Sequence, residues 1–303
     1  MNRSIKIQEE QERIIDMCRF TWNMKAANEV FSFERDIYHW YLQHRPECNS
    51  VYLPLFWIAI WRVAHIYPIG DVSVLIESIS KIYDGLNRQI TYFTIASEVH
   101  CNKRSFPKLP SEVHVYGPGY NYGEDEGIIC HEIPLLPFSQ RFFYNENRDI
   151  FCSYSISGEY RCRKKLNDFL YGCEGRCSNG FVTTFRVPFR LYCEILSRST
   201  FVLTPRGTNI AVYRLYEAIQ HGAIPVYISD KYSLPYSNEV DWNNLAIFIN
   251  QNDIDKIPNI LRSISTEQVY KMQNYGKWFM ANYINLDILC QKIFTHANTI
   301  NLL

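Results

Sequence analysis

Residues 201–230 read FVLTPRGTNIAVYRLYEAIQHGAIPVYISD, and this stretch decides the fold that we expect. A short apolar run ends at Thr204 and is followed by the tight turn Pro205-Arg206-Gly207. Apolar residues then recur at helical spacing from Val212 to His221, and a second apolar run covers Ile224 to Ile228. A strand, a helix and a second strand in this order predict two parallel strands joined by a helical crossover.

The same alternation extends over the rest of the chain. Helical spacing covers residues 11–44, and the order of strand and helix repeats from residue 150 onward. Two such groups predict an α/β fold with two Rossmann-like, doubly wound domains, 1–150 and 151–303, that face each other across a crevice. Alternatively, the last helix packs back on the first domain.

The composition argues against several classes of protein. The chain has 31 basic and 31 acidic side chains and no basic tail, so we expect no nucleic-acid partner. The first 12 residues contain no apolar signal core, and the apolar stretch Val51–Ile60 is too short to span a bilayer. We therefore expect a cytoplasmic protein without a membrane span, whose 10 cysteines are reduced thiols.

The turn and helix at 205–221 offer a site for a phosphate-bearing ligand. Gly207 allows close backbone approach, and Asn209 is predicted to cap the helix, whose first N–H groups favour an anion. Arg214 and Glu217 lie three positions apart on one helix face. A guanidinium group suits a diphosphate and a carboxylate suits ribose hydroxyls, although the same spacing also fits an ordinary surface ion pair.

Three segments make this interpretation more specific. They are PRG at 205–207, YRLYEAIQHGAIPVYISD at 213–230 and LPYSNEVDW at 234–242. In this order they resemble the nucleotide-sugar-binding signature of exostosin-type glycosyltransferases. Weaker similarity covers VYLPLFW at 51–57, ITYFTIASEVH at 90–100 and DIFCSYSISGEYRCRKKL at 149–166.

The resemblance implies a two-domain fold of the GT-B type, in which the C-terminal domain binds a nucleotide-activated sugar, usually UDP-linked. It also implies that the acceptor binds the N-terminal domain and that the anomeric centre inverts. By position, Arg214 and Glu217 match the family's diphosphate and ribose contacts. Arg161 matches its upstream phosphate contact, and Arg206 matches the arginine of its Pro-Arg-Gly turn. Many cellular members carry an N-terminal membrane helix that this sequence does not show, so we expect a bacterial or viral enzyme acting in the cytosol.

An inverting transfer needs a base that takes the proton of the acceptor hydroxyl. Glu98 and His100, which follow the predicted strand at 90–97, are the candidates, and the acidic residues 124–126 are alternatives. Arginines and a helix N-terminus can neutralise the leaving diphosphate, so we expect neither an obligatory metal nor another cofactor. The one Asp-x-Asp sequence, at 253–255, is interpreted as a helix cap.

These observations predict an inverting hexosyl- or pentosyltransferase that moves a sugar from a UDP-sugar donor to a hydroxyl of a glycan acceptor. The alternative is a catalytically inactive or hydrolytic nucleotide-sugar-binding protein on the same fold, which needs the same donor pocket. A Rossmann-type oxidoreductase is disfavoured because no Gly-x-Gly-x-x-Gly sequence follows an early strand.

Overall fold

The computed structural model describes residues 3–22, 33–57, 60, 72–96, 110, 113–118, 129–134, 136, 147–156, 161–172, 180–207 and 209–300. The chain divides into two compact units: unit 1 contains Met1–Ile133 and Leu286–Leu303, and unit 2 contains Pro134–Asn285. This division differs from the predicted boundary at 150/151, because residues 134–149 belong to unit 2. The last helix belongs to unit 1, which is the alternative that the sequence left open.

Unit 1 is built on a four-stranded parallel sheet whose strands follow the order of the chain, β1-β2-β3-β4. The strands are β1 (Val51–Tyr52), β2 (Tyr92–Ile95), β3 (Val113–Gly117) and β4 (Ile129–Glu132). The helices are α1 (Arg3–Trp22), α3 (Phe33–His44), α5 (Val72–Asp84) and α11 (Leu286–Thr299). Helix α1 begins before the predicted residue 11, and Ile7 of this earlier part joins Ile14 and Cys18 in the core.

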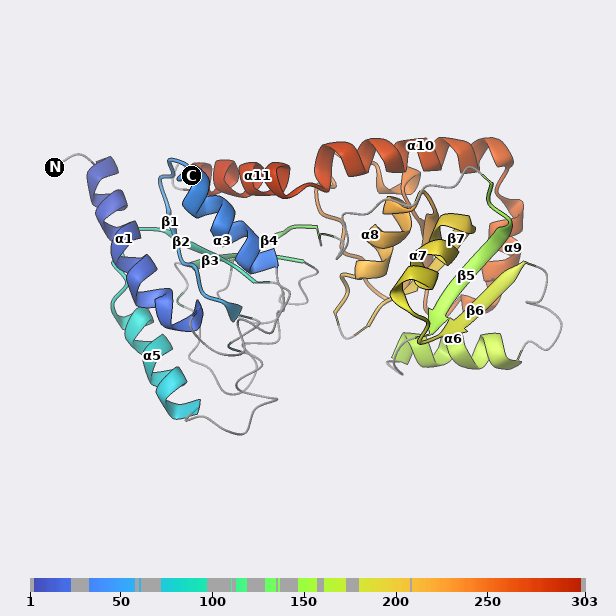
Figure 1. Cartoon of the computed structure of the whole chain (residues 1–303), viewed down its shortest axis with the longest axis horizontal. Helices are drawn as coiled ribbons and strands as arrows, with labels where there is room; N and C mark the ends of the chain where they lie inside the picture. Colours follow the sequence, from blue (N-terminus) through green and yellow to red (C-terminus); the bar gives the residue numbers. More distant parts are fainter. Residues whose placement is uncertain are drawn as a thin grey trace. The chain divides into compact units, whose positions relative to one another are not determined.

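Alternating side chains divide the core of unit 1 into two layers, because successive strand residues point to opposite faces of a sheet. Val51, Tyr92 and Val113 pack in one cluster with residues of α1 and α5. On the other face, Tyr52 and Phe93 contact the ring of Phe294 in α11, which also packs with α3. Helices thus cover both faces of this sheet (Figure 1).

Unit 2 contains a five-stranded parallel sheet in the order β6-β5-β7-β8-β9. Its strands are β5 (Ile150–Ile156), β6 (Phe181–Phe185), β7 (Ser199–Pro205), β8 (Ile224–Ser229) and β9 (Ile247–Asn250). Its helices are α6 (Arg161–Gly172), α7 (Phe189–Arg198), α8 (Tyr213–Gln220), α9 (Ile257–Ser263) and α10 (Thr266–Tyr283), with short 3-10 helices η2 (Trp242–Asn244) and η3 (Ile254–Lys256). The chain steps from β5 to β6 on one side and then crosses back to β7 on the other, so the strand order reverses between β5 and β7.

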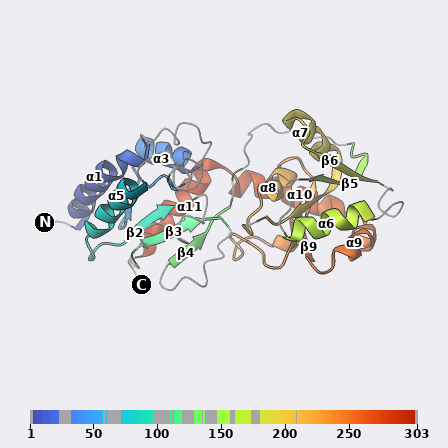
Figure 2. The ribbon, with the colours of Figure 1, turned by 90° about the horizontal axis from the view of Figure 1, so that it is seen from below.

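The helices of unit 2 also cover both faces of their sheet. Cys162 and Leu166 of α6 and Leu261 of α9 pack in one core cluster. Leu196 of α7 and Ala218 of α8 pack in another, and α6 and α7 lie on opposite sides of β5 and β6 (Figure 2). The predicted α/β class with parallel sheets is confirmed, whereas the crevice between the domains stays a prediction. In the described part of the chain, no helix is both long and apolar enough to cross a membrane.

Candidate functional site

The reversal of strand order in unit 2 marks the place where this kind of sheet binds ligands. In open α/β sheets, ligands bind outside the carboxyl ends of the strands at the point where the order reverses. Here those ends are Ile156 of β5 and Pro205 of β7. Helix α6 follows β5 and helix α8 follows β7, so residues near the starts of both helices belong to this edge of the sheet.

Arg206 holds the turn after β7 against the end of β8. Its backbone N–H donates to the carbonyl oxygen of Ile228 at 2.9 Å, and its guanidinium, only 5% exposed, pairs with Asp230. Burial acts to raise the pKa of the Asp230 carboxyl, but the hydrogen bond and charge of Arg206, together with backbone N–H groups of residues 230 and 231, outweigh it and lower that pKa. Arg206 therefore has a structural partner, and its predicted contact with a phosphate stays a prediction.

Gly207 leaves room for an arginine that comes from another element. A β-carbon at this position would lie 3.0 Å from Nη2 of Arg163 in α6. The missing side chain therefore lets the Arg163 guanidinium lie over the turn. The sequence predicted that another group lies close to the backbone at Gly207, and in the structure this group is the Arg163 side chain.

Two guanidinium groups share the site at the strand reversal. Burial lowers the pKa of Arg163, and the positive charge of Arg214 lowers it further. Cζ of Arg214 lies 5.5 Å from the ring centroid of Tyr154 in β5, within cation–π range. Like charges held together in a partly buried place favour an anion, and the planar guanidinium fork suits phosphate oxygens.

Glu217 lies one helical turn beyond Arg214 in α8 and is tied to the neighbouring helix α7. The hydroxyl of Tyr192 donates a 2.6 Å hydrogen bond to Oε2 of Glu217. Burial raises the pKa of the Glu217 carboxyl, although the Tyr192 hydrogen bond and the charge of Arg214 act in the opposite direction. The site thus places a fixed carboxyl group beside Arg214.

The start of α8 differs from the sequence prediction. Asn209 does not cap this helix, because its Oδ1 accepts from the N–H of Ala211 at 3.2 Å and the helix begins only at Tyr213. The N-cap residue is Val212, whose side chain cannot accept a hydrogen bond. The short polar side chain of Asn209 shapes the turn before the helix instead.

Of the predicted site residues, the structure brings together Arg206, Gly207, Arg214 and Glu217. Arg161 is the first residue of α6. The candidate bases Glu98 and His100, like the alternatives at 124–126, lie outside the described residues.

The Asp-x-Asp sequence has the position that was predicted for it. Asp253 occupies the N-cap position of η3, without a side-chain cap bond, and its carboxylate accepts from Nζ of Lys256 at 2.6 Å. Among the residues that the structure describes, no cluster of His, Cys, Asp and Glu side chains is suited to hold a metal ion. Metal-independent transfer stays a prediction.

Sequence reasoning did not single out Arg163, Tyr154 or Tyr192. Arg161 and Arg163 flank Cys162, which is buried and faces the core of unit 2. Each of the two arginines is about 100° from Cys162 around the helix, so helical spacing does not distinguish them. Only the structure, which brings the turn at Gly207 next to α6, shows that Arg163 lies at the site.

Comparisons with known proteins place this site within a known domain. Residues 150–264 match the family model of the Exostosin GT47 domain. The exostosin-1 homolog of Caenorhabditis elegans is 40% identical over 86 residues, which are 28% of this chain and 22% of the relative. Exostosin-2 of Homo sapiens is 29% identical over 115 residues, which are 35% of this chain and 16% of that protein. The chain thus spans less than a quarter of the length of these relatives.

Solved structures with a similar course of the chain include glycosyltransferases. An alpha-glucosyltransferase in complex with UDP and a 13-mer DNA aligns with a TM-score of 0.46 and 10% identity, covering 76% of both chains. The GtfA/B complex aligns with a TM-score of 0.44 and 10% identity, covering 89% of this chain and 61% of that one. Residues 150–264, which lie within unit 2, match the exostosin GT47 domain, and together with the similarity to curated exostosins this makes the chain exostosin-like, as its sequence motifs predicted.

Proposed function

We propose that the chain is an inverting glycosyltransferase that moves a hexosyl or pentosyl group from a UDP-sugar to a hydroxyl of a glycan acceptor. The observation that carries the proposal is the pair Arg163 and Arg214 at the strand reversal, where each guanidinium opposes the charge of the other. A diphosphate would relieve this repulsion. The GT47 match over the same residues supports a sugar nucleotide as its source.

Each group of the site has a role in this proposal. Arg163 and Arg214 bind the diphosphate and stabilise the charge that develops on it as the bond to the sugar breaks. Glu217, held by Tyr192, accepts hydrogen bonds from the ribose hydroxyls. Arg206 positions the turn through its ion pair with Asp230.

In the reaction, the acceptor oxygen bonds to C1 of the sugar from the side opposite the diphosphate. The bond between C1 and the diphosphate oxygen breaks, and its electron pair leaves with UDP. The hydroxyl proton goes to a base, for which Glu98 and His100 remain our candidates. Because fixed guanidinium groups neutralise UDP, we propose that the transfer needs no divalent metal and proceeds in excess EDTA. The cytoplasmic setting is likewise part of the proposal.

A calorimetric titration tests the donor site. UDP should bind the wild-type protein, and Arg214→Ala should weaken binding by about 30-fold, since a hydrogen bond to a charged group contributes about 2 kcal/mol. Arg262→Ala is the matched control, because Arg262 is exposed in α9. Failure of UDP to bind the wild type, or equal losses in both variants, would contradict the donor assignment.

A product analysis tests the stereochemistry. With an alpha-linked UDP-sugar, the glycoside formed on an oligosaccharide acceptor should have the beta configuration, visible in the anomeric proton coupling. An alpha product contradicts inversion. UDP-sugar hydrolysis that no acceptor diverts into a glycoside would favour the hydrolytic alternative instead.

A further inference from the structure

Unit 1 contains a cavity that takes no part in the function proposed above. Its volume is about 710 Å³, within the range of roughly 300–1,000 Å³ that small-ligand sites occupy. The segment 45–50, which leads directly into β1, forms one wall, and α1, α3 and α11 contribute the others. The cavity therefore lies beside the amino end of β1, whereas reacting groups of parallel α/β sheets gather at the carboxyl ends.

The floor of the cavity is a rigid group of aromatic rings. Tyr41, Tyr52, Phe93 and Phe294 line it and are all buried. The ring centroids of Tyr41 and Phe294 lie 5.5 Å apart, and those of Tyr52 and Phe93 lie 5.3 Å apart. Interlocked rings cannot collapse into the space above them, so the cavity is preformed.

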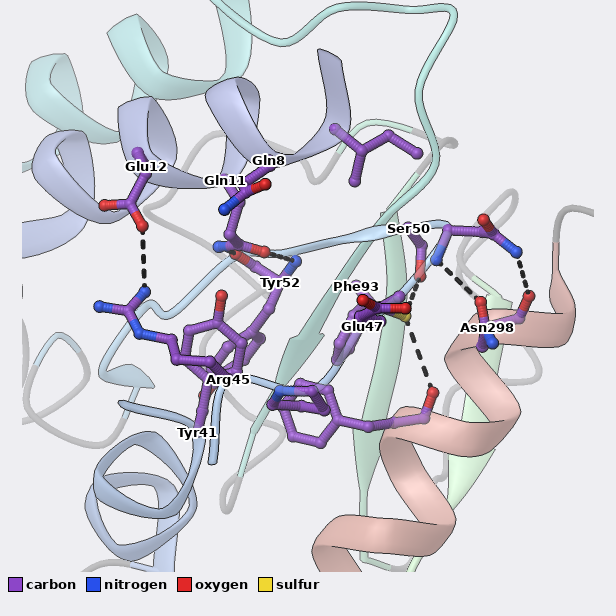
Figure 3. Close-up of a pocket in the computed structure, with 15 residues that line it drawn as sticks. Gln8, Gln11, Glu12, Tyr41, Arg45, Glu47, Ser50, Tyr52, Phe93 and Asn298 are labelled. Atoms are coloured by element: carbon purple, nitrogen blue, oxygen red, sulfur yellow. Dashed lines mark hydrogen bonds and ion pairs between the residues drawn. The ribbon is translucent and has the colours of Figure 1, made fainter. Parts of the chain in front are cut away.

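Polar pairs fix the two ends of the cavity (Figure 3). At one end, Nη1 of Arg45 lies 3.2 Å from Oε1 of Glu12. At the other, the backbone N–H of Asn49 donates to Oδ1 of Asn298 at 2.9 Å. Between them, the amide of Gln11 both donates to and accepts from the backbone of Tyr52, at 2.7 Å each.

Two lining groups remain available for a ligand. The side chains of Gln8 and Glu47 make no hydrogen bond or ion pair with any residue that the structure describes. The Gln8 amide offers donors and an acceptor, and the Glu47 carboxylate offers acceptors. With Glu12 and Arg45 paired, Glu47 leaves the lining with an excess of negative charge, which disfavours phosphates and acidic sugars.

We propose that this cavity binds a neutral sugar unit of a glycan. An uncharged ligand rich in hydroxyls can pair with amides and carboxylates at once. The choice of a sugar among polyhydroxyl compounds rests on the proposed function, whereas the cavity itself does not. Because it lies by the amino end of β1, the site holds the glycan and does not take part in the transfer step.

Saturation-transfer NMR on the full chain tests the site with maltose, cellobiose and lactose as probes and glucuronic acid as the acidic comparison. At least one neutral disaccharide should receive saturation, and glucuronic acid should receive less. Gln8→Trp, which fills the cavity mouth, should remove the signal. Gln291→Trp on the exposed side of α11 should leave it intact.

A second variant keeps the test valid if Gln8→Trp does not fold. Glu47→Ala lies in an exposed loop and should weaken disaccharide binding at least fivefold by calorimetry. UDP titrated against the same samples separates the two proposals, because donor binding should be unchanged in every variant. Absence of any disaccharide signal, insensitivity to both Gln8→Trp and Glu47→Ala, or a preference for glucuronic acid would overturn the sugar site.

Discussion

The two parallel sheets differ in the order of their strands: unit 1 keeps the order of the chain, whereas unit 2 reverses it between β5 and β7. The reversal sends α6 and α8 to opposite faces of the sheet while both begin at the same edge. Arg163 and Arg214 thereby reach one site from two sides. In unit 1 the described strands make no such reversal, and the cavity lies beside the amino end of β1. Strand order thus determines where each unit can gather charged groups.

The largest effect should follow from breaking the aromatic layer of unit 1. Phe294 is buried among the rings of Trp40, Tyr41, Tyr52 and Phe93. We expect Phe294→Ala to lower the free energy of unfolding of unit 1 by about 3–5 kcal/mol, as truncation of a buried Phe does. Urea unfolding measures it, and UDP affinity of the folded variant should be unchanged. Phe189→Ala, at an exposed ring of α7, should change stability by less than about 0.5 kcal/mol.

Removing one arginine of the pair in unit 2 should affect UDP binding strongly and stability little, which is the opposite of the effect expected for Phe294→Ala. Arg163 opposes the charge of Arg214, so removing it should leave the melting temperature of the free protein unchanged or higher. The same Arg163→Ala variant should lose about 2 kcal/mol of UDP affinity. Thermal unfolding with and without UDP measures both effects. A strong destabilisation of the free protein with UDP binding intact would assign Arg163 to the fold and not to the site.

Acid should weaken unit 1 through the histidines on its sheet. Burial, followed by the charges of His296 and His114, lowers the pKa of His131 to about 4. The unfolded residue titrates near about 6.5, so the unfolded chain binds more protons between these values and stability is lost as pH falls from about 6.5 through about 4. Because water reaches part of the ring, we expect a loss of only about 1–2 kcal/mol.

The measurement is urea unfolding at several values of pH across this window. His131→Phe should flatten the pH dependence, and His39→Phe, at an exposed position of α3, should not. Equal slopes for the wild type and His131→Phe would show that other groups cause the acid sensitivity.

The smallest effect concerns the ribose. If Glu217 accepts from the ribose hydroxyls, the wild type should bind UDP about fivefold more tightly than 2′-deoxy-UDP, for a hydrogen bond worth about 1 kcal/mol. Glu217→Ala should remove most of this preference. Tyr192→Phe keeps the carboxylate but loses its 2.6 Å hydrogen bond, so an intermediate preference is expected. An undiminished preference in Glu217→Ala would exclude the ribose contact.

Much of unit 2 was predictable because its local signals agree with each other. The strand before Pro205, the turn, the helix and the strand from Ile224 were each read from spacing, and each is present. The side chains that complete the site were not predictable from spacing. Arg163 and Tyr154 reach the site through the packing of α6 and β5 against the turn. Asn209 illustrates the reverse case, since a residue suited to a cap shapes the preceding turn.

Unit 1 was less predictable from spacing alone. Ile7 extends α1 toward the N-terminus, but it stands among charged residues that hide its part in the apolar face. The cavity had no sequence signal, because its walls combine Gln8, Glu47 and Asn298 from three distant segments. Such combinations arise only when α11 closes over the sheet.

The membership of α11 in unit 1 has a consequence for how the protein is made. Unit 2 occupies one continuous stretch of chain, so all of its residues are synthesised before residue 286. The aromatic layer of unit 1 must wait for Phe294, although its other rings lie between residues 40 and 93. Domains generally fold in the order of synthesis. Here the domain that is begun first is finished last, and its nascent form must keep an apolar face exposed while about 150 intervening residues are synthesised.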